Sequence, residues 1–185
     1  TIKGQGLVDV SPRAAAEAGV GYVPRERKIE GIVSGMSVYE NMTLSQQKKF
    51  SEFGILKISA ERQLARDWIK KLAIKASSEN ADSGNLSGGN QQKVVLSKWR
   101  SAGSDIMLLD HPTRGLDIGA KEDVYEMIRD MSDAGVGILL VADTFEEAIG
   151  LAHTIIVIKD GKIQKRFEYG LESKPTPYDL LHAMV

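Results

Sequence analysis

The strongest constraint on the fold is a pair of short segments made almost entirely of apolar residues. Residues 106–110 read IMLLD, and residues 136–143 read VGILLVAD. Strands this apolar favour burial on both faces, as in the interior of a parallel sheet. A helix at residues 121–132 separates them, with its apolar residues at helical spacing. Strand, helix and strand in this order predict an α/β fold with a mostly parallel core sheet flanked by helices.

The stretch from residue 37 to residue 102 interrupts this alternation with helices. Ser37 is the expected N-cap of a helix within residues 36–50. Apolar residues at helical spacing predict a second helix over residues 59–72. A third helix is expected to begin at the paired glycines of LSGG and to end near Gly103. We therefore expect a helical subdomain beside the sheet.

Local signals define the remaining elements. Residues 1–10 are expected to form a short edge strand or a hairpin, and the charged, glycine-spaced residues 25–35 a loop. The pair Asp160-Gly161 lies between two alternating segments and favours a type I′ hairpin turn. Thr176 is placed to cap a terminal helix.

Composition restricts the classes of partner. The 185 residues include 24 basic and 25 acidic side chains, which gives a net charge of −1. No overall field attracts nucleic acid or an anionic membrane, so no nucleic-acid partner is expected. No apolar run approaches the ~20 residues of a membrane span, so no direct membrane insertion is expected. The absence of cysteine excludes disulfides and thiolate metal sites, and fits a cytosolic setting.

The segment LSGGNQQK, residues 86–93, is the most specific chemical signal. Two glycines at a helix start leave backbone amides free of side chains, so that a phosphate can approach the positive end of the helix dipole. The Ser87 hydroxyl adds a donor beside Gly88 and Gly89. Together with Gln91, these residues form the expected phosphate-binding motif.

Asp110 ends the first apolar strand, at the sheet edge where α/β proteins bind ligands. A carboxylate at this point suits Mg²⁺, directly or through water. An aspartate that only begins a turn is the alternative. The following RGLD contains Asp117, which suits both the N-cap of the next helix and contact with a partner subunit.

In this order, LSGG, the strand with its aspartate, RGLD, a second apolar strand and a hairpin resemble the nucleotide-binding domain of ABC transporters. GYVPRERK, GMSVYENMTL, NLSGGNQQKVVLSKW and PTRGLDIGAK resemble, more narrowly, the second ATPase half of subunits that energise ribose- and galactose-type sugar importers. The resemblance covers about residues 1–168 and leaves the final helix unassigned. It implies a P-loop NTPase-like fold, incomplete here, that uses ATP and Mg²⁺.

The resemblance also implies partners and an organisation. A second ATP-binding domain would pair head to tail with this one, and the transporter's membrane subunits would hold it at the cytoplasmic face of the plasma membrane. Four regions are expected: the start of the core (1–36), the helical signature subdomain (37–102), the core sheet with hairpin (103–168) and a tail helix (169–185).

Three positions depart from the family pattern. His111 stands where a glutamate normally polarises the attacking water, Asp143 where a switch histidine is expected, and Arg25 where a glutamine or glutamate contacts the site. Histidine can accept a proton but provides no fixed negative charge. His111 is therefore either an altered base or an ordinary turn residue, and the three changes together suggest a degenerate hydrolytic site.

The sequence contains no GxxxxGK[ST] phosphate loop. Without those amides and that lysine, the β- and γ-phosphates have no cradle, so the chain resembles a fragment that hydrolyses almost no ATP alone. The alternatives are a non-hydrolysing regulatory half of an ATPase dimer, and the head of a DNA-maintenance ABC ATPase. Balanced charge and the lack of long heptad repeats disfavour the latter.

Overall fold

The computed structural model describes residue 4, residues 11–168 and residues 174–185. The chain forms two compact units, Thr1–Leu139 and Leu140–Val185. The boundary falls inside a strand. The four regions expected from the sequence remain a prediction. The strand or hairpin expected over residues 1–10 lies outside the described residues. In the part of the chain that is described, no helix is long and apolar enough to cross a membrane.

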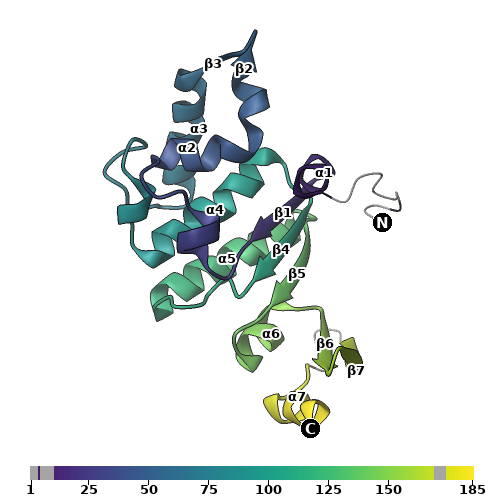
Figure 1. The fold of residues 1–185 in the computed structure, drawn as a ribbon. Coiled ribbons are helices and arrows are strands. Elements are labelled where there is room, and N and C mark those ends of the chain that lie inside the picture. The colour runs from purple at the N-terminus through teal and green to yellow at the C-terminus, as the bar shows by residue number, and fades with distance from the viewer. Residues whose placement is uncertain (1–3, 5–10, 169–173) are drawn as a thin grey trace. The chain divides into compact units, whose positions relative to one another are not determined.

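The core sheet of the first unit contains β1 (Val20–Val23), β4 (Ile106–Asp110) and β5 (Gly137–Val141) in the order β1-β4-β5 (Figure 1). β1 and β4 run parallel, with Val20 opposite Ile106 and Val23 opposite Leu109. The central place of β4 and the parallel pairing confirm the α/β prediction.

Two long helices, α4 (Gly88–Ala102) and α5 (Ile118–Asp133), lie on the same side of these strands (Figure 1). Their buried residues include Val94, Val95, Leu96, Val124 and Ile128. The expectation that both sheet faces are covered is wrong for the described residues, because Leu139 of β5 is 61% exposed and Tyr22 of β1 is 43% exposed. The helices cover one face, while these side chains project from strands at the edges of the sheet.

Gly21 allows α4 to approach β1 closely. A β-carbon on Gly21 would lie 2.7 Å from Met107 Sδ and 2.8 Å from Trp99 Cβ. Such distances are far below van der Waals contact, so any larger residue would push the helix from the sheet. The short helix α1 (Pro12–Glu17), capped by Ser11, leads into this strand.

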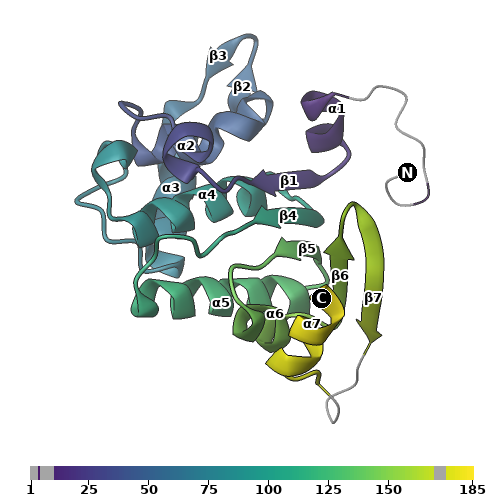
Figure 2. The ribbon, with the colours of Figure 1, turned by 60° about the horizontal axis from the view of Figure 1, so that its bottom comes forward.

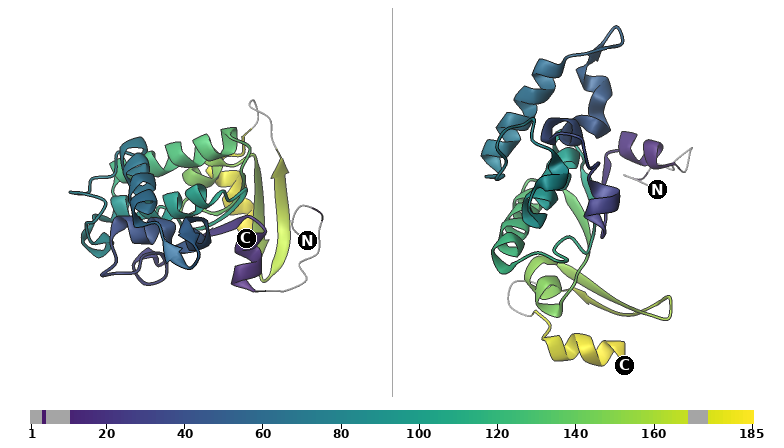
Figure 3. Two further views of the ribbon diagram at one scale, coloured as in Figure 1. Left: turned by 90° about the horizontal axis from the view of Figure 1, so that it is seen from above. Right: turned by 60° about the vertical axis from the view of Figure 1, so that its left-hand side comes forward.

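The helical region, residues 37–102, forms one end of the first unit (Figure 3). Ser37 caps α2 (Val38–Thr43) in a capping box with Glu40, as predicted. The helix ends earlier than expected, at Thr43, and continues as the 3₁₀ helix η2 (Leu44–Phe50), within which the backbone of Gln46 leaves the helical range. A hairpin that the sequence did not reveal follows, made of β2 (Ser51–Glu52) and β3 (Ile55–Leu56).

The rest of this region agrees closely with the prediction. The helix expected over residues 59–72 is α3 (Ile58–Lys71), and α4 ends at the left-handed Gly103. The polar loop between these helices contains one 3₁₀ turn, η3 (Ser83–Asn85).

Residues 25–35, predicted to be a loop, contain the π-helix η1 (Arg27–Gly31). The buried Lys98 of α4 donates from Nζ to the carbonyl oxygen of Gly31 over 2.8 Å. Burial holds the pKa of Lys98 below its ordinary value. A single π-turn needs such tertiary support, which local sequence signals do not reveal.

The second unit contains α6 (Phe145–Leu151), β6 (Thr154–Lys159), β7 (Lys162–Glu168) and α7 (Pro177–Met184), which Figure 2 shows in green and yellow. Asp160 and Gly161 both have positive φ, 51° and 72°, which confirms the type I′ turn. Ile155, Val157 and Leu180 form a common core, so the terminal helix packs with the hairpin.

We expect Gly21→Ala to destabilise the chain by about 1–3 kcal/mol, because the new methyl group would overpack the contact between β1 and α4. The measurement is urea unfolding followed by circular dichroism. Gly137→Ala is the matched control, because its β-carbon would meet atoms no closer than 3.8 Å. Equal effects of the two substitutions would contradict the close approach of α4.

Candidate functional site

The start of α4 lies at the centre of the candidate site. Ser87 is its N-cap residue, yet the Ser87 hydroxyl accepts from Asn90 Nδ2 over 2.7 Å and makes no hydrogen bond to a backbone amide of the helix start. The positive end of the helix dipole therefore has no capping side chain. An anion that accepts hydrogen bonds from these amides fits this helix start.

Close packing also explains why glycine occupies positions 88 and 89. A β-carbon on Gly88 would lie 2.5 Å from Arg27 Nη2, and one on Gly89 would lie 2.6 Å from Ala120 Cβ of α5. Both glycines are half-buried. The motif therefore lets α5 and the Arg27 side chain approach the helix start, and larger residues at either position would separate them.

Asp110 ends β4 as predicted, with 35% of its side chain exposed. The Tyr22 hydroxyl lies 3.5 Å from Asp110 Oδ2, longer than a typical O–H···O hydrogen bond. Partial burial, and then the negative charge of Asp110, raise the pKa of Tyr22. Tyr22 was not predicted as a site residue, because its approach to Asp110 depends on the pairing of β1 with β4.

His111 lies beside Asp110, with 3.8 Å between His111 Nε2 and Asp110 Oδ1. Its backbone φ is 47°, uncommon for a residue with a side chain. The strand thus ends in a tight turn that places the imidazole next to the carboxylate. This geometry allows a proton-accepting role and also a purely structural one.

Asp110 fits a Mg²⁺ ligand by its chemistry, because Mg²⁺ in nucleotide sites is held by one or two carboxylates and by phosphate oxygens and water. Among the described residues, no group of three His, Cys, Asp or Glu side chains is arranged to hold a metal ion. A magnesium ion at Asp110 would therefore depend on the nucleotide for the rest of its coordination.

A cavity of about 210 Å³ lies beside the start of α4 and is strongly basic. Its lining consists of Arg25, Glu26, Arg27, Lys28, Arg114 and Gly115. The exposed Arg25, predicted to contact nucleotide, is therefore placed among cationic neighbours that the sequence analysis did not single out.

Arg27 connects this cavity to the helix start. Its Nη1 donates to the carbonyl oxygen of Arg114 over 2.7 Å, and Arg114 Nη1 in turn lies 2.7 Å from Glu26 Oε1. Burial lowers the pKa of Arg27, but a guanidinium remains charged. Arg27 Nε is buried and has no hydrogen-bond partner among the described residues. These contacts bring the π-turn, the RGLD loop and Gly88 together around one cation.

Gln91 was predicted to belong to the phosphate-binding motif, but its side chain is buried. The side chain is only 2% exposed, and its amide nitrogen donates to the carbonyl oxygens of Ser83 and Gly84. Direct contact with a nucleotide is therefore inconsistent with its position. The amide supports the 3₁₀ turn η3, just before LSGG.

Asp117 and Asp143 both occur at helix starts. Asp117 Oδ1 accepts from the Ala120 amide over 2.8 Å, which confirms its role as the N-cap of α5. Asp143 belongs to the second unit, where its amide donates to Glu147 Oε2 at the start of α6. The exposed Asp117 remains available to a partner, and the switch role of Asp143 remains a prediction.

We expect Gly89→Ala to cost about 1–3 kcal/mol, because the added methyl group meets the Ala120 methyl group between two packed helices. Gly88→Ala should cost less than about 1 kcal/mol, since the flexible end of Arg27 can move aside. Urea denaturation measures both. A larger loss for Gly88→Ala would contradict the packing described above.

Comparisons with known proteins identify the family of the chain. A family model described as ABC transporter matches residues 1–114. The arabinose import ATP-binding protein AraG of Rhizobium meliloti is 42% identical over 154 residues, which are 83% of this chain and 30% of that protein. The ribose import ATP-binding protein RbsA of Roseobacter denitrificans is 38% identical over 162 residues, which are 88% of this chain and 32% of that protein.

A solved structure shares the fold. It is a dimeric ATP-binding cassette in a post-hydrolysis state bound to ADP and Pi, with a TM-score of 0.66 at 23% identity over 80% of this chain and 62% of that chain. The chain spans about a third of the length of the AraG and RbsA relatives. Because the family model covers more than half of the residues, the chain belongs to the ABC transporter family.

Proposed function

We propose that the chain is part of an ATP-binding subunit of a sugar importer, where ATP binding and hydrolysis drive carbohydrate import. The observation that carries this proposal is the helix start at Ser87–Gly89, which lacks a capping side chain and lies beside a basic cavity. Support for sugar as the cargo class comes from the similarity to arabinose and ribose import proteins.

In this proposal, a second ATP-binding domain holds the nucleotide by its phosphate loop and pairs head to tail with this chain. The Ser87 hydroxyl and the amides at the start of α4 then donate to the terminal phosphate. Arg25 and Arg27 add positive charge nearby, and Asp117 contacts the partner. Bound Mg²⁺ neutralises phosphate charge, and Asp110 is the residue that would hold it.

The same proposal places the chain at the inner face of the plasma membrane, held there by the importer's membrane subunits. Arg27 joins the π-turn to both the helix start and the RGLD loop. A displacement of residues 25–33 by a membrane subunit would therefore move groups that contact the nucleotide, which would couple transport to ATP.

A second candidate function is a regulatory half that binds nucleotide but does not hydrolyse it. The position of His111 favours it, because the imidazole lies against Asp110 and adds no negative charge to a magnesium site. Arg25 and Asp143 replace two further residues of the hydrolytic pattern. The fold and the contacts between domains are the same in both candidates, and only turnover distinguishes them.

We expect the purified chain to release no measurable phosphate from ATP, but to associate in the presence of ATP with a cassette domain that carries a GxxxxGK[ST] loop. Ser87→Asp should weaken this association about tenfold or more, because a carboxylate would repel the terminal phosphate. Aspartate is a good N-cap residue, so the fold is retained. Light scattering after size-exclusion chromatography measures the complex.

Ser11→Asp is the matched control for this experiment, because Ser11 is also an N-cap residue and caps α1. Association that tolerates Ser87→Asp as well as Ser11→Asp would contradict the role of the helix start. Turnover by the isolated chain that is lost in Asp110→Asn would contradict the expected inactivity.

His111→Glu separates the two candidate functions. The suitable protein is a chimera in which the part of the AraG relative that precedes the matched region is fused to this chain. If this half is regulatory, His111→Glu should raise phosphate release about tenfold or more, within the range of a restored general base. The exposed His153 provides the control His153→Glu, which should change nothing. Unchanged turnover in His111→Glu, with loss in His111→Ala, would instead show that the histidine acts as the base.

A further inference from the structure

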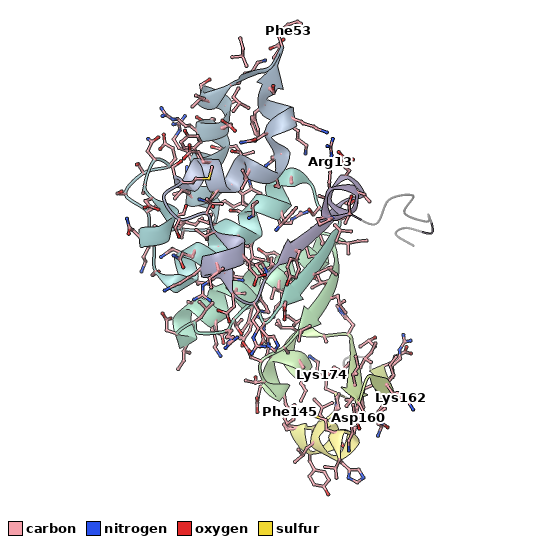
Figure 4. The ribbon with its side chains drawn as sticks, viewed as in Figure 1. Arg13, Phe53, Phe145, Asp160, Lys162 and Lys174 are labelled. Atoms are coloured by element: carbon pink, nitrogen blue, oxygen red, sulfur yellow. The ribbon has the colours of Figure 1, made fainter. Side chains whose placement is uncertain are left out.

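The hairpin of β2 and β3 presents apolar side chains to solvent. Phe53 is 98% exposed and Ile55 is 73% exposed. Figure 4 shows Phe53 at the far end of this hairpin, which projects from the end of the helical region. No contact with the described residues accounts for this exposed aromatic side chain, because almost none of its surface is covered.

The backbone at the tip is also unfavourable for the residue it carries. Phe53 has a φ of 51° and Gly54 a φ of 79°, as in a type I′ turn. Asparagine, aspartate or glycine usually occupies the first of these positions, and a bulky residue there is a genuine outlier. Folding therefore gains nothing from a phenylalanine at this point, which favours a role in binding.

The residues next to the tip are mainly basic. Lys48, Lys49 and Lys57 lie in the segments that enter and leave the hairpin, and Glu52 is the one acidic residue from position 44 to position 58. Lys49 Nζ donates to the carbonyl oxygen of Ala102, and Lys48 Nζ lies 3.2 Å from Glu17 Oε1. Lys57 pairs with Glu52. With three lysines and one glutamate, positions 44–58 carry a net charge of +2, although Lys48 and Lys57 are each paired with a carboxylate. The chain as a whole has a net charge of −1.

We infer that this hairpin contacts an anionic lipid surface, with Phe53 and Ile55 entering the interfacial layer and the lysines at the level of the headgroup phosphates. Interfacial binding strengthens with the apolar area that enters the lipid and with the attraction of nearby lysines to anionic headgroups, so a tip of this size gives weak, reversible binding. A stable protein interface instead buries about 800 Å² on each partner, much more than the tip of a hairpin of this size provides. The inference goes beyond the proposed function and involves none of the nucleotide-site residues.

This contact differs from the expectation drawn from composition, which found no attraction to an anionic membrane. Net charge averages over the chain, whereas lipid binding depends on charge within about one Debye length, ~10 Å, of the surface. The hairpin does not span the membrane, and its own binding to lipid is weak and reversible. It would orient the helical region toward the membrane once other contacts hold the chain there.

The experiment uses the absence of cysteine from the chain. Phe53→Cys and, as a control in an exposed loop, Ser77→Cys each provide a unique site for a nitroxide label. Vesicles contain equal parts of phosphatidylcholine and phosphatidylglycerol, or phosphatidylcholine alone. The label at position 53 should become accessible to oxygen and protected from a water-soluble nickel complex with the anionic vesicles only, and the label at position 77 should remain in water.

A binding measurement complements the labels, because the labelled variant Phe53→Cys lacks the phenylalanine that is proposed to enter the lipid. Sedimentation with anionic vesicles should show about tenfold weaker binding for Ile55→Ser than for the parent chain. The control is Ile118→Ser, at an apolar residue that is 83% exposed on α5, and it should bind like the parent.

Three results would overturn the inference. The first is a label at position 53 that remains in water with anionic vesicles. The second is an equal response of the two labels, or of the two serine variants. The third is protection of position 53 by a second copy of the chain without lipid. The last result would assign the hairpin to a protein contact.

Discussion

The close packing of α4 against β1 is the contact on which the rest of the structure depends. Gly21 brings Trp99 and Met107 together with the strand, and this contact places the helix across one face of the sheet. The same helix carries Gly88 and Gly89 at its start, against Arg27 and Ala120. Because one helix connects the strands to the proposed phosphate-binding motif, a change in its packing would move the candidate site as a unit.

The candidate site is built from segments that are far apart in the sequence. Arg27 of the π-turn touches the start of α4 and binds the carbonyl oxygen of Arg114, and Tyr22 of β1 approaches Asp110 of β4. Four basic side chains line one small cavity, and Glu26 is the one acidic residue of the lining. Cations this close together repel one another unless an anion binds between them. This imbalance supports the phosphate-binding role proposed for the site, in a hydrolytic or a regulatory half alike.

Much of the fold was predictable because local signals and the tertiary structure agree. The apolar segment IMLLD became the central strand, Ser37 and Asp117 became helix caps, and Asp160-Gly161 became a type I′ turn. The failures have physical reasons. The π-turn at Arg27–Gly31 depends on Lys98 from another helix, and the β2–β3 hairpin has a phenylalanine where such turns usually have asparagine or glycine.

The sequence by itself determined the family, the order of strands and helices, and the motif that begins α4, because these follow from apolar spacing, capping residues and short strings of residues. Only the tertiary structure decided that Gln91 is buried beneath η3, that Arg27 covers Gly88, and that Phe53 stands in solvent. Burial and contacts between distant segments depend on how the helices and strands pack, and a local sequence pattern does not specify that packing.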